Sequence, residues 1–367
     1  MRSIATAPRR RRRSREARGR ALAGLLFVAP AVIILGVFLF LPILTAGWVS
    51  VSDWNGKGSP LQPGVEFVGT ANYASFLTEE GLAQKDFGTS IRNNLYYVLV
   101  SVPLVTAIAL ALALMVNKSR RGNGVFRTAF YFPSVTSSVA LTVIFLFLFN
   151  STGVVNEILS LINVEGPTWM ADPRGIFHLA LEGLGIPKPA PGAGFEFWGV
   201  SWWDWLSGPS VAMTVFILMA ALAASGTFML IFLAGLQQIS DEIEEAAIID
   251  GTTRWQRFRY VTLPMLRPTL FTVLTLCMIG SWQVFDQIYT GSQGNPAKTT
   301  LTPAYLSYEW SFKSSDWGQG AAVSFILFAI ILLFTLLQRW GLRERTSDRS
   351  GRLRAARTQK GDPSEDH

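Results

Sequence analysis

The sequence predicts an all-α polytopic membrane protein with six transmembrane helices. Three observations support this prediction: the composition, six long apolar stretches and the distribution of the basic residues. Of the 367 residues, 50% are hydrophobic and 16% are charged, whereas an ordinary soluble domain has about 25% charged residues. This deficit of charge excludes a disordered chain and argues against a soluble enzyme. Much of the surface is therefore expected to contact lipid.

Six stretches are long enough to cross a bilayer, which takes roughly 20 mostly apolar residues in a helix. A helix is required because it satisfies every backbone N–H and C=O internally. Together the stretches define a transmembrane domain over residues 21–340, and Asp286 is the only acidic or basic side chain within them. The predicted spans are residues 21–47, 93–116, 128–149, 209–236, 269–290 and 318–338.

The basic residues set the expected orientation. If the N-terminus is cytoplasmic, the inside segments hold 25 of the 32 Lys and Arg residues. These segments are residues 1–20, 117–127, 237–268 and 339–367. An excess of Lys and Arg on the cytoplasmic side determines topology. We therefore expect both termini in the cytoplasm, with a basic tail over 1–20 and a polar tail over 341–367. The net charge of +7 then reflects the orientation of the chain in the membrane and does not indicate nucleic-acid binding.

Some classes are excluded by the N-terminal run and by the few Cys and His residues. The arginine run Arg9–Arg13 imitates the start of a secretory signal. A signal core has about 7–15 apolar residues, and the run over 21–47 is longer, so we expect an uncleaved first helix.

The single cysteine, Cys277, excludes an intramolecular disulfide framework and a cysteine-based metal centre. With only His178 and His367, a histidine-rich metal site is excluded as well.

The predicted outer segment over residues 150–208 is rich in tryptophan. Tryptophan favours the membrane interface, where its ring is half buried and its N–H stays hydrated. Interface anchoring is therefore one interpretation of this segment. Contact with a sugar or a partner protein is the other.

The predicted cytoplasmic loop over residues 237–268 is the most informative. Ser240 is the expected N-cap of a short helix whose acidic residues suit the positive end of the helix dipole. Gly251 is expected to end that helix in the left-handed conformation, and Pro264 is expected to end a second, arginine-rich helix. Two alanines, at 246 and 247, leave a shallow surface that a partner protein could approach closely. The alternative is a loop helix that lies against its own bundle.

The spacing in this loop resembles the cytoplasmic motif of ABC importer permeases. Glu245-Ala246-Ala247 is followed after three residues by Gly251 and after nine more by Val261-Thr262-Leu263-Pro264. The family pattern is Glu-Ala-Ala, three residues, Gly, nine residues, Ile-x-Leu-Pro. The chain departs from it at Val261, and it has Thr252 where members often have Ala.

The resemblance implies the type I ABC importer permease fold and a coupling helix that docks onto a cytoplasmic ATPase. The residues that it places at the contact are Glu245, Ala246, Ala247, Asp250 and Gly251. Further segments resemble the carbohydrate branch of the family, in particular the larger permease subunit of maltose and glycerol-phosphate importers. These segments are Val49–Trp54, Phe67–Tyr73, Phe285–Tyr289 with Gly294–Pro296, and Gly318–Ala322.

The same resemblance implies import of a sugar or oligosaccharide across the plasma (inner) membrane of a prokaryote. It implies three kinds of protein partner: a second homologous permease subunit, two cytoplasmic ATPase subunits and an extracytoplasmic sugar-binding protein. The chain itself has no Walker A pattern; the nearest imitation, residues 291–298, lacks the adjacent Gly-Lys and lies outside. We therefore expect no enzymatic activity and no cofactor in this chain, with ATP and Mg²⁺ bound by the partner ATPase.

A sugar site within a membrane needs polar groups that match hydroxyls, and aromatic faces among apolar walls. The fifth span supplies such groups, and an acid within a span is a functional candidate by default. The fourth span adds residues at positions that resemble the sugar-contact region of the family. The candidates for the substrate path are Ser225, Thr227, Trp282, Gln283 and Asp286. The alternatives are helix packing for Ser225 and Thr227, and simple hydration or pairing with the second permease for Asp286.

Three other functions are weighed against sugar import. The same machinery can carry glycerol phosphate or a polyol. An ion-driven secondary transporter would be expected to show an inverted repeat or a relay of ionisable residues within the membrane, and Asp286 alone is thin support for one. A membrane scaffold without transport is disfavoured by the loop motif.

Overall fold

The computed structural model describes residues 10–117, 122–186 and 194–341. The outer parts of the two predicted tails, residues 1–9 and 342–367, lie outside the described residues. The chain divides into two compact units, which share the long helices α4 (Leu82–Asn117) and α17 (Trp317–Gly341). The first unit holds residues up to 91, 189–205 and 303–326, and the second holds the rest.

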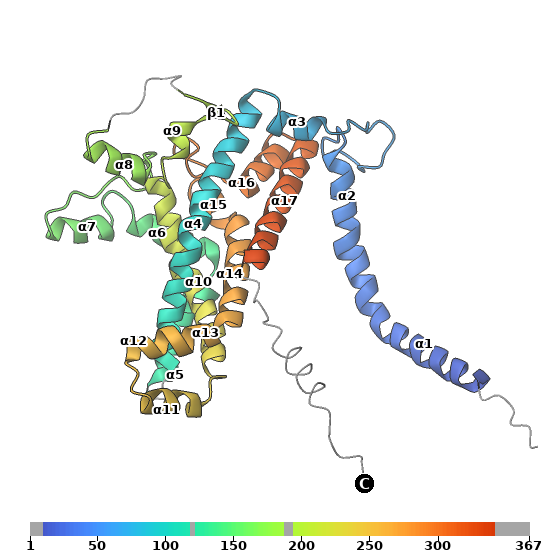
Figure 1. Cartoon of the computed structure of the whole chain (residues 1–367). Helices are drawn as coiled ribbons and strands as arrows, with labels where there is room; N and C mark the ends of the chain where they lie inside the picture. Colours follow the sequence, from blue (N-terminus) through green and yellow to red (C-terminus); the bar gives the residue numbers. More distant parts are fainter. Residues whose placement is uncertain (1–9, 118–121, 187–193, 342–367) are drawn as a thin grey trace, which may run out of the picture. The chain divides into compact units, whose positions relative to one another are not determined.

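The first unit begins with a long apolar helix drawn in blue in Figure 1. It consists of α1 (Arg10–Leu35), a π-helical turn η1 (Gly36–Phe40) and α2 (Leu41–Ser50). A proline ring clashes with the carbonyl four residues earlier, and for Pro42 that carbonyl belongs to Phe38, within the π turn. The wider turn lets the helix continue past the proline. No residue in the most apolar window of this helix, within Arg20–Ser50, is buried.

The rest of the first unit consists of short elements around aromatic side chains. They are α3 (Ala71–Leu77), the start of α4, β1 (Glu196–Phe197), β2 (Val200–Ser201), α9 (Trp202–Trp205), α16 (Pro303–Tyr308), η3 (Glu309–Lys313) and the start of α17. The two strands pair antiparallel, with Phe197 opposite Val200. Phe76 is fully buried and contacts Phe87 and Trp310, with ring centroids 5.9 and 5.8 Å away. These contacts tie α3, α4 and η3 together.

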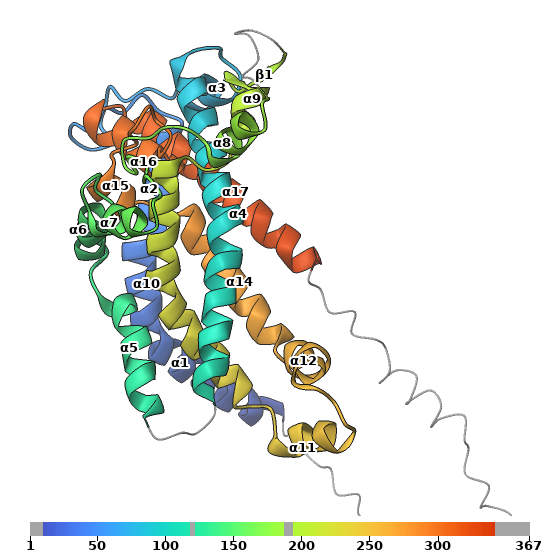
Figure 2. The same ribbon diagram turned by 90° about the vertical axis from the view of Figure 1, so that its left-hand side faces the viewer.

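The second unit is built around α10 (Val211–Leu236), which packs against α5 (Asn123–Val135), α14 (Arg267–Trp282) and α6 (Ser138–Leu148). Figure 2 shows α10 beside α5. The main apolar core joins α4, α10 and α14 through Ala109, Ala113, Val116, Met229, Phe232, Leu233, Leu236, Leu266 and Val273. The remaining elements are α7 (Val154–Leu161), α8 (Ile176–Gly183), α11 (Asp241–Ile249), α12 (Arg254–Arg257), η2 (Phe258–Thr262), α13 (Leu263–Met265) and α15 (Asp286–Gly291).

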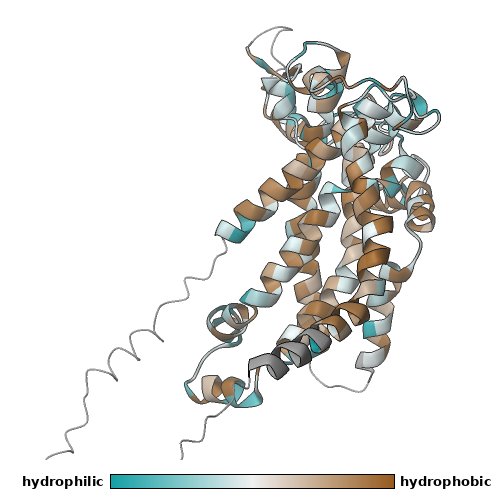
Figure 3. Cartoon of the chain, turned by 90° about the vertical axis from the view of Figure 1, so that its right-hand side faces the viewer, coloured by the Kyte–Doolittle hydropathy of each residue, from teal (hydrophilic) through white to brown (hydrophobic). Residues whose placement is uncertain are grey.

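Five helices in the described residues are long and apolar enough to cross a membrane, and a bent pair makes up to six. The polytopic all-α fold class is therefore confirmed. Hydrophobic residues line these helices, while hydrophilic ones concentrate at helix ends and in the connections (Figure 3).

The structure differs from the sequence prediction in the third span. The expected single helix over 128–149 is two helices, α5 and α6, bent by 96° at Thr136 and Ser137. Pro133 lies in the last turn of α5, and the hydroxyl of Thr136 donates to the carbonyl of Phe132. Proline together with hydroxyl side chains that bond to the local backbone weakens a helix at this point. The fifth span is interrupted as well, between α14 and α15.

Candidate functional site

The cytoplasmic-loop candidate lies between α10 and α14 and folds as two short helices, α11 and α12 (Figure 1). Ser240 occupies the N-cap position of α11 in an extended conformation, but its side chain makes no capping bond. The first turn holds three acids, Asp241, Glu242 and Glu244, which complement the positive end of the helix dipole. Gly251 has φ +74°, the left-handed conformation that ends α11.

Thr252 closes the end of α11. Its hydroxyl donates to the carbonyl of Ala247 at 2.6 Å, and its backbone N–H donates to the same carbonyl at 3.2 Å. Thr253 then caps α12 in a reciprocal capping box with Gln256. The turn at Gly251 is therefore held by short-range bonds between residues close in sequence.

The second helix of the loop does not end at Pro264, contrary to the sequence prediction. It continues from α12 through the π-helical turn η2 into α13, which contains Pro264 near its start. The carbonyl four residues before Pro264 belongs to Tyr260, inside η2, so the π turn relieves the expected clash. The arrangement repeats that of η1 and Pro42.

Most of the predicted docking residues are on the surface of α11. Glu245, Ala246, Asp250 and Gly251 are exposed, whereas Ala247 is only 8% exposed and faces its own chain. Two isoleucines beside them, at 248 and 249, are 56% and 84% exposed. We call the exposed set Glu245, Ala246, Ile248, Ile249, Asp250 and Gly251 the α11 surface.

The sequence predicts Trp255 as an apolar anchor of this loop, but it does not single out Ile248, Ile249 or Tyr260. Besides the two isoleucines, Trp255 and Tyr260 are 65% and 70% exposed. Such a concentration of apolar side chains in a polar loop is typical of a surface that another molecule covers. The helical spacing of residues 246–249 could have revealed this exposure. It places Ala246, Ile248 and Ile249 on different faces of the helix from the buried Ala247.

The fifth-span candidates lie at the end of α14 and the start of α15, where residues 283–285 are not helical. We call residues 283–285 the α14–α15 break. Trp282 is 1% exposed, and its ring lies 5.2 Å from that of Phe334. Gln283 and Asp286 are exposed, and Asp286 is the first residue of α15. The structure therefore brings these three side chains to one break but exposes only two of them.

Polar side chains of α4 form hydrogen bonds with residues on both sides of the α14–α15 break. Asn94 donates to the carbonyl of Trp282 at 2.9 Å, and Gln287 donates to the hydroxyl of Tyr97 at 2.9 Å. One turn further along α4, the hydroxyls of Ser101 and Ser281 lie 3.3 Å apart. The positions 94, 97 and 101 follow a helical period, and this polar stripe in an otherwise apolar span is the signal by which the sequence could have revealed them.

Two buried polar atoms beside the break have no hydrogen-bond partner within the described part of the chain. They are Oδ1 of Asn94 and Nε1 of Trp282. An unpaired buried polar group is unfavourable by about 1–3 kcal/mol. Both atoms therefore have an unused hydrogen-bonding capacity that a ligand or a water molecule could satisfy.

The fourth-span candidates lie in a helix contact. The hydroxyl of Ser225 donates to the carbonyl of Leu222 in its own helix, and the backbone N–H of Thr227 donates to the hydroxyl of Ser134 in α5. A Cβ atom on Gly226 would lie 2.4 Å from the carbonyl oxygen of Phe130, so α10 and α5 need a glycine here. Ser225 is buried and Thr227 is exposed, so only Thr227 offers a free surface, and the contacts of this segment are those of helix packing.

Tryptophans of the outer segment mostly contact the chain itself. The indole of Trp169 donates to Asn156 at 2.6 Å, and that of Trp205 donates to the carbonyl of Phe197 at 3.3 Å. Nearby, the Arg174 guanidinium donates to the carboxylate of Asp172 and holds its pKa below the ordinary value. Among the described residues, no group of three or more His, Cys, Asp or Glu side chains could hold a metal ion.

Comparisons with known proteins identify the family of the chain. The profile of the family described as "Binding-protein-dependent transport system inner membrane component" matches residues 104–344. The chain is 32% identical over 327 residues to the lactose transport system permease protein LacF of Rhizobium radiobacter, covering 88% of this chain and 94% of the relative. It is 28% identical to the trehalose/maltose transport system permease protein MalF of Thermococcus litoralis, covering 86% and 92%.

A solved structure shares the fold. It is the crystal structure of a bacterial alginate ABC transporter in complex with an alginate pentasaccharide-bound periplasmic protein, with a TM-score of 0.68 and 19% identity over 90% of this chain and 98% of that chain. The family match covers more than half of the chain and includes α10, the α11 loop and the α14–α15 break. The chain therefore belongs to the family of binding-protein-dependent transport system inner membrane components, the permease subunits of ABC importers.

Proposed function

We propose that this integral membrane permease imports a sugar or oligosaccharide and is driven by ATP hydrolysis on a separate subunit. The observation that carries the proposal is the α11 surface: a loop that keeps the motif spacing of the family and exposes Glu245, Ala246 and Gly251 together with apolar side chains. The substrate class rests on the relatives, whose names refer to lactose, to trehalose and maltose, and to multiple sugars.

The proposed orientation places both termini and the α11 surface in the cytoplasm. It is supported by the 25 of 32 basic residues that fall on that side. The chain then acts with a second homologous permease, two ATPase subunits that bind ATP and Mg²⁺, and an extracytoplasmic sugar-binding protein. Glu245, Ala246, Asp250 and Gly251 contact the ATPase, and Ala247 supports them from beneath.

The loop is positioned to transmit a displacement of the ATPase into the membrane. It joins the end of α10 to the start of α14, and these two helices are in close contact at Gly235, where a Cβ atom would lie 2.5 Å from Thr269 Oγ1 and 3.1 Å from Leu266 Cδ2. A push on α11 therefore moves α10 and α14 as one body. Such rigid-body movement is how alternating access is produced.

The α14–α15 break lies at the other end of α14, so the same movement reaches the substrate candidates. Asp286 and Gln283 offer exposed hydrogen-bonding groups for sugar hydroxyls, and Trp282 offers an unpaired indole N–H at the same place. The ring of Trp282 is buried in this structure, so in this proposal it meets the sugar only when the break opens. Thr227 on α10 is a weaker candidate, because its segment mainly packs on α5.

The test is to purify the assembled transporter with its binding protein and to identify the bound solute by mass spectrometry. We then expect uptake of that solute into proteoliposomes to require both ATP and the binding protein. A polyol or glycerol phosphate on the binding protein would contradict the substrate class and leave the coupling proposal intact. Uptake driven by an ion gradient without ATP, or ATP hydrolysis by this chain alone, would overturn the division of labour.

A further inference from the structure

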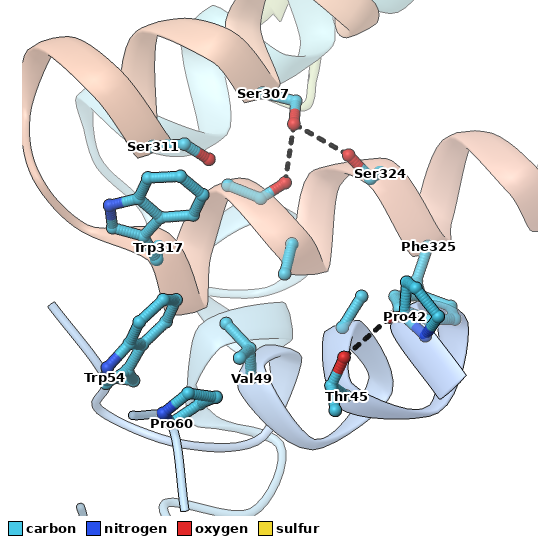
Figure 4. A pocket seen from close by; sticks show the side chains of 13 residues that line it. Pro42, Thr45, Val49, Trp54, Pro60, Ser307, Ser311, Trp317, Ser324 and Phe325 are labelled. Carbon is cyan, nitrogen blue, oxygen red and sulfur yellow. Dashed lines mark hydrogen bonds between the residues drawn. The ribbon is translucent and has the colours of Figure 1, made fainter. Parts of the chain in front are cut away.

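A pocket of about 320 Å³ lies within the first unit, between α2 and the start of α17 (Figure 4). One wall is a stripe of α2, with Pro42, Thr45 and Val49 at helical spacing. The facing wall is formed by α17, with Ala321 and Ser324. Trp54, Pro60 and Trp317 stand at one end of the pocket, and Pro42 and Phe325 stand at the other.

Close packing and hydrogen bonds fix the shape of the α17 wall. Gly320 allows η3 and α16 to approach α17 closely, because a Cβ atom there would lie 2.0 Å from Ser311 Oγ and 2.8 Å from the carbonyl oxygen of Ser307. The hydroxyl of Ser307 bonds at 2.7 Å to the Gly320 carbonyl and shares a second 2.7 Å bond with the hydroxyl of Ser324. These bonds fix the floor of the pocket beside the small side chain of Ala321.

The polar groups around the pocket are mostly occupied by the chain itself. The hydroxyl of Thr45 donates to the carbonyls of Leu41 and Pro42, and the indole of Trp54 donates to the carbonyl of Lys57. Among the described residues that line the pocket, none is acidic or basic. A sugar needs many available donors and acceptors, so the pocket is suited to hydrocarbon rather than to substrate.

Both walls belong to membrane helices. α2 is the end of the candidate span Arg20–Ser50, and α17 is the candidate span Trp317–Gly341. α2 also exposes apolar side chains next in sequence to the pocket residues, with Leu41 and Leu44 57% and 73% exposed. From Val49 to Pro42 the pocket extends about 10 Å along the helix, at 1.5 Å per residue.

The two tryptophans mark the level of the pocket in the bilayer. The rings of Trp54 and Trp317 are 5.4 Å apart, and Trp317 also contacts Phe312 at 4.7 Å. Tryptophan concentrates where the headgroups meet the hydrocarbon. The tryptophan end therefore lies at the interface, and the proline end lies about 10 Å deeper in the acyl-chain region.

We propose that this pocket binds one acyl chain of a membrane phospholipid, with the glycerol end of the lipid beside Trp54 and Trp317. The lipid fills the space between α2 and α17 and so extends the packing of the first helix beyond its buried end at Val49 and Ser50. The polar groups of the lining are mostly bonded within the chain, which argues against the transported solute as the occupant. Bulk lipid is as apolar as the pocket, so retention depends on packing contacts rather than on the hydrophobic effect.

The test uses the full chain with its partners in vesicles that contain a phosphatidylethanolamine carrying a photoreactive diazirine in the middle of one acyl chain. After illumination and digestion, adducts are mapped by mass spectrometry. We expect them to concentrate on the peptides with residues 42–49 and 317–325. Ala321→Phe, which fills the pocket, abolishes this enrichment. The same change at the exposed Ala329 of α17, outside the pocket, leaves it in place.

A second pair of variants shows whether a loss of labelling in Ala321→Phe results from filling the pocket or from misfolding of that variant. Ala46→Phe fills the pocket from α2, and Ala31→Phe adds the same bulk at an exposed position of α1. Equal labelling of wild type and both filling variants would overturn the proposal. So would the absence of adducts at the pocket peptides while other spans are labelled, which would mean that a protein covers the pocket. Displacement of the label by an oligosaccharide would assign the pocket to substrate and overturn it as well.

Discussion

The α11 surface and the α14–α15 break are built in opposite ways. The loop holds its shape by bonds between near neighbours, such as Thr252 with Ala247, and it leaves Ile249 84% exposed. The break is held by bonds to residues 188 and 190 positions away, from Asn94 to Trp282 and from Gln287 to Tyr97. A self-contained loop with exposed apolar side chains is typical of an interface. The break is instead stabilised by hydrogen bonds from another helix, α4. Of its site candidates, only Gln283 and Asp286 are exposed.

This difference determines what a substitution should do in each region. A change on the α11 surface should leave folding intact and remove communication with a partner. A change in the packed helices should mainly lower stability. It should affect transport only where the structure leaves a buried polar atom without a hydrogen-bond partner. The variants below test these two patterns.

The largest effect is expected from Ala246→Lys. The residue is exposed near the C-terminal end of α11, where a cation suits the helix dipole, so the loop should stay folded. In the proposed docking, a charge buried against the ATPase removes docking energy of the size of an interface hot spot, about 2–4 kcal/mol, and transport should fall roughly 30- to 1,000-fold. Uptake by proteoliposomes is the measurement, alongside the thermal unfolding of the chain.

The control is Gln238→Lys, which adds the same charge at an exposed residue before α11. We expect near-normal uptake from it. If Ala246→Lys imported as well as this control, α11 would not be the docking element, and the contrast between the two regions would be lost.

Gly226→Ala tests whether the fourth-span segment is packing or pathway. The added Cβ atom would meet the Phe130 carbonyl oxygen at 2.4 Å and the Tyr131 Cα at 2.9 Å, both backbone atoms of α5. Overpacking of this kind is unfavourable by about 1–3 kcal/mol, so the unfolding midpoint should fall. Gly280→Ala is the matched control, because its Cβ atom meets nothing within 4 Å. Unchanged stability with lost uptake would instead favour a substrate role for Ser225 and Thr227.

Trp282→Phe tests the break. Phenylalanine keeps a six-membered ring beside Phe334 and the backbone carbonyl that accepts from Asn94. It removes the five-membered part of the indole, including an N–H that has no partner among the described residues. If that N–H meets the solute, losing one hydrogen bond of about 1.4 kcal/mol should lower transport about tenfold. The lost ring volume leaves a cavity at a buried site, so stability should fall as well, and transport is compared per folded molecule.

Trp169→Phe is the matched control, because it should lower stability without lowering transport per folded molecule. Its indole is bonded to Asn156 at 2.6 Å in the outer segment, so the variant should lose stability and keep its transport rate per folded molecule. Identical behaviour of the two variants in both assays would remove Trp282 from the substrate path.

The two regions also differ in how far the sequence could predict them. The loop motif spans some 20 residues, so spacing alone located its turn at Gly251 and its acidic first turn. The burial of Ala247 and the π turn before Pro264 were not predictable, because each depends on how the helix packs. Six apolar stretches were evident from hydropathy, yet the bend at Thr136 and the polar bonds from Asn94 were not, because they arise between helices distant in sequence.

Thr252→Ala should give the smallest effect and tests whether the loop truly depends on local bonds. The change removes the hydroxyl that donates to the Ala247 carbonyl at 2.6 Å, while the backbone N–H of residue 252 still donates to the same atom. The loss of one of two bonds should weaken the end of α11 by about 0.5–1 kcal/mol, seen as faster hydrogen exchange at residues 250–252. Transport should fall no more than about fivefold, the equivalent of 1 kcal/mol. Thr252→Ser keeps the hydroxyl and should match the wild type. A loss of transport as large as that of Ala246→Lys, with exchange unchanged, would place Thr252 in the interface itself rather than in the turn behind it.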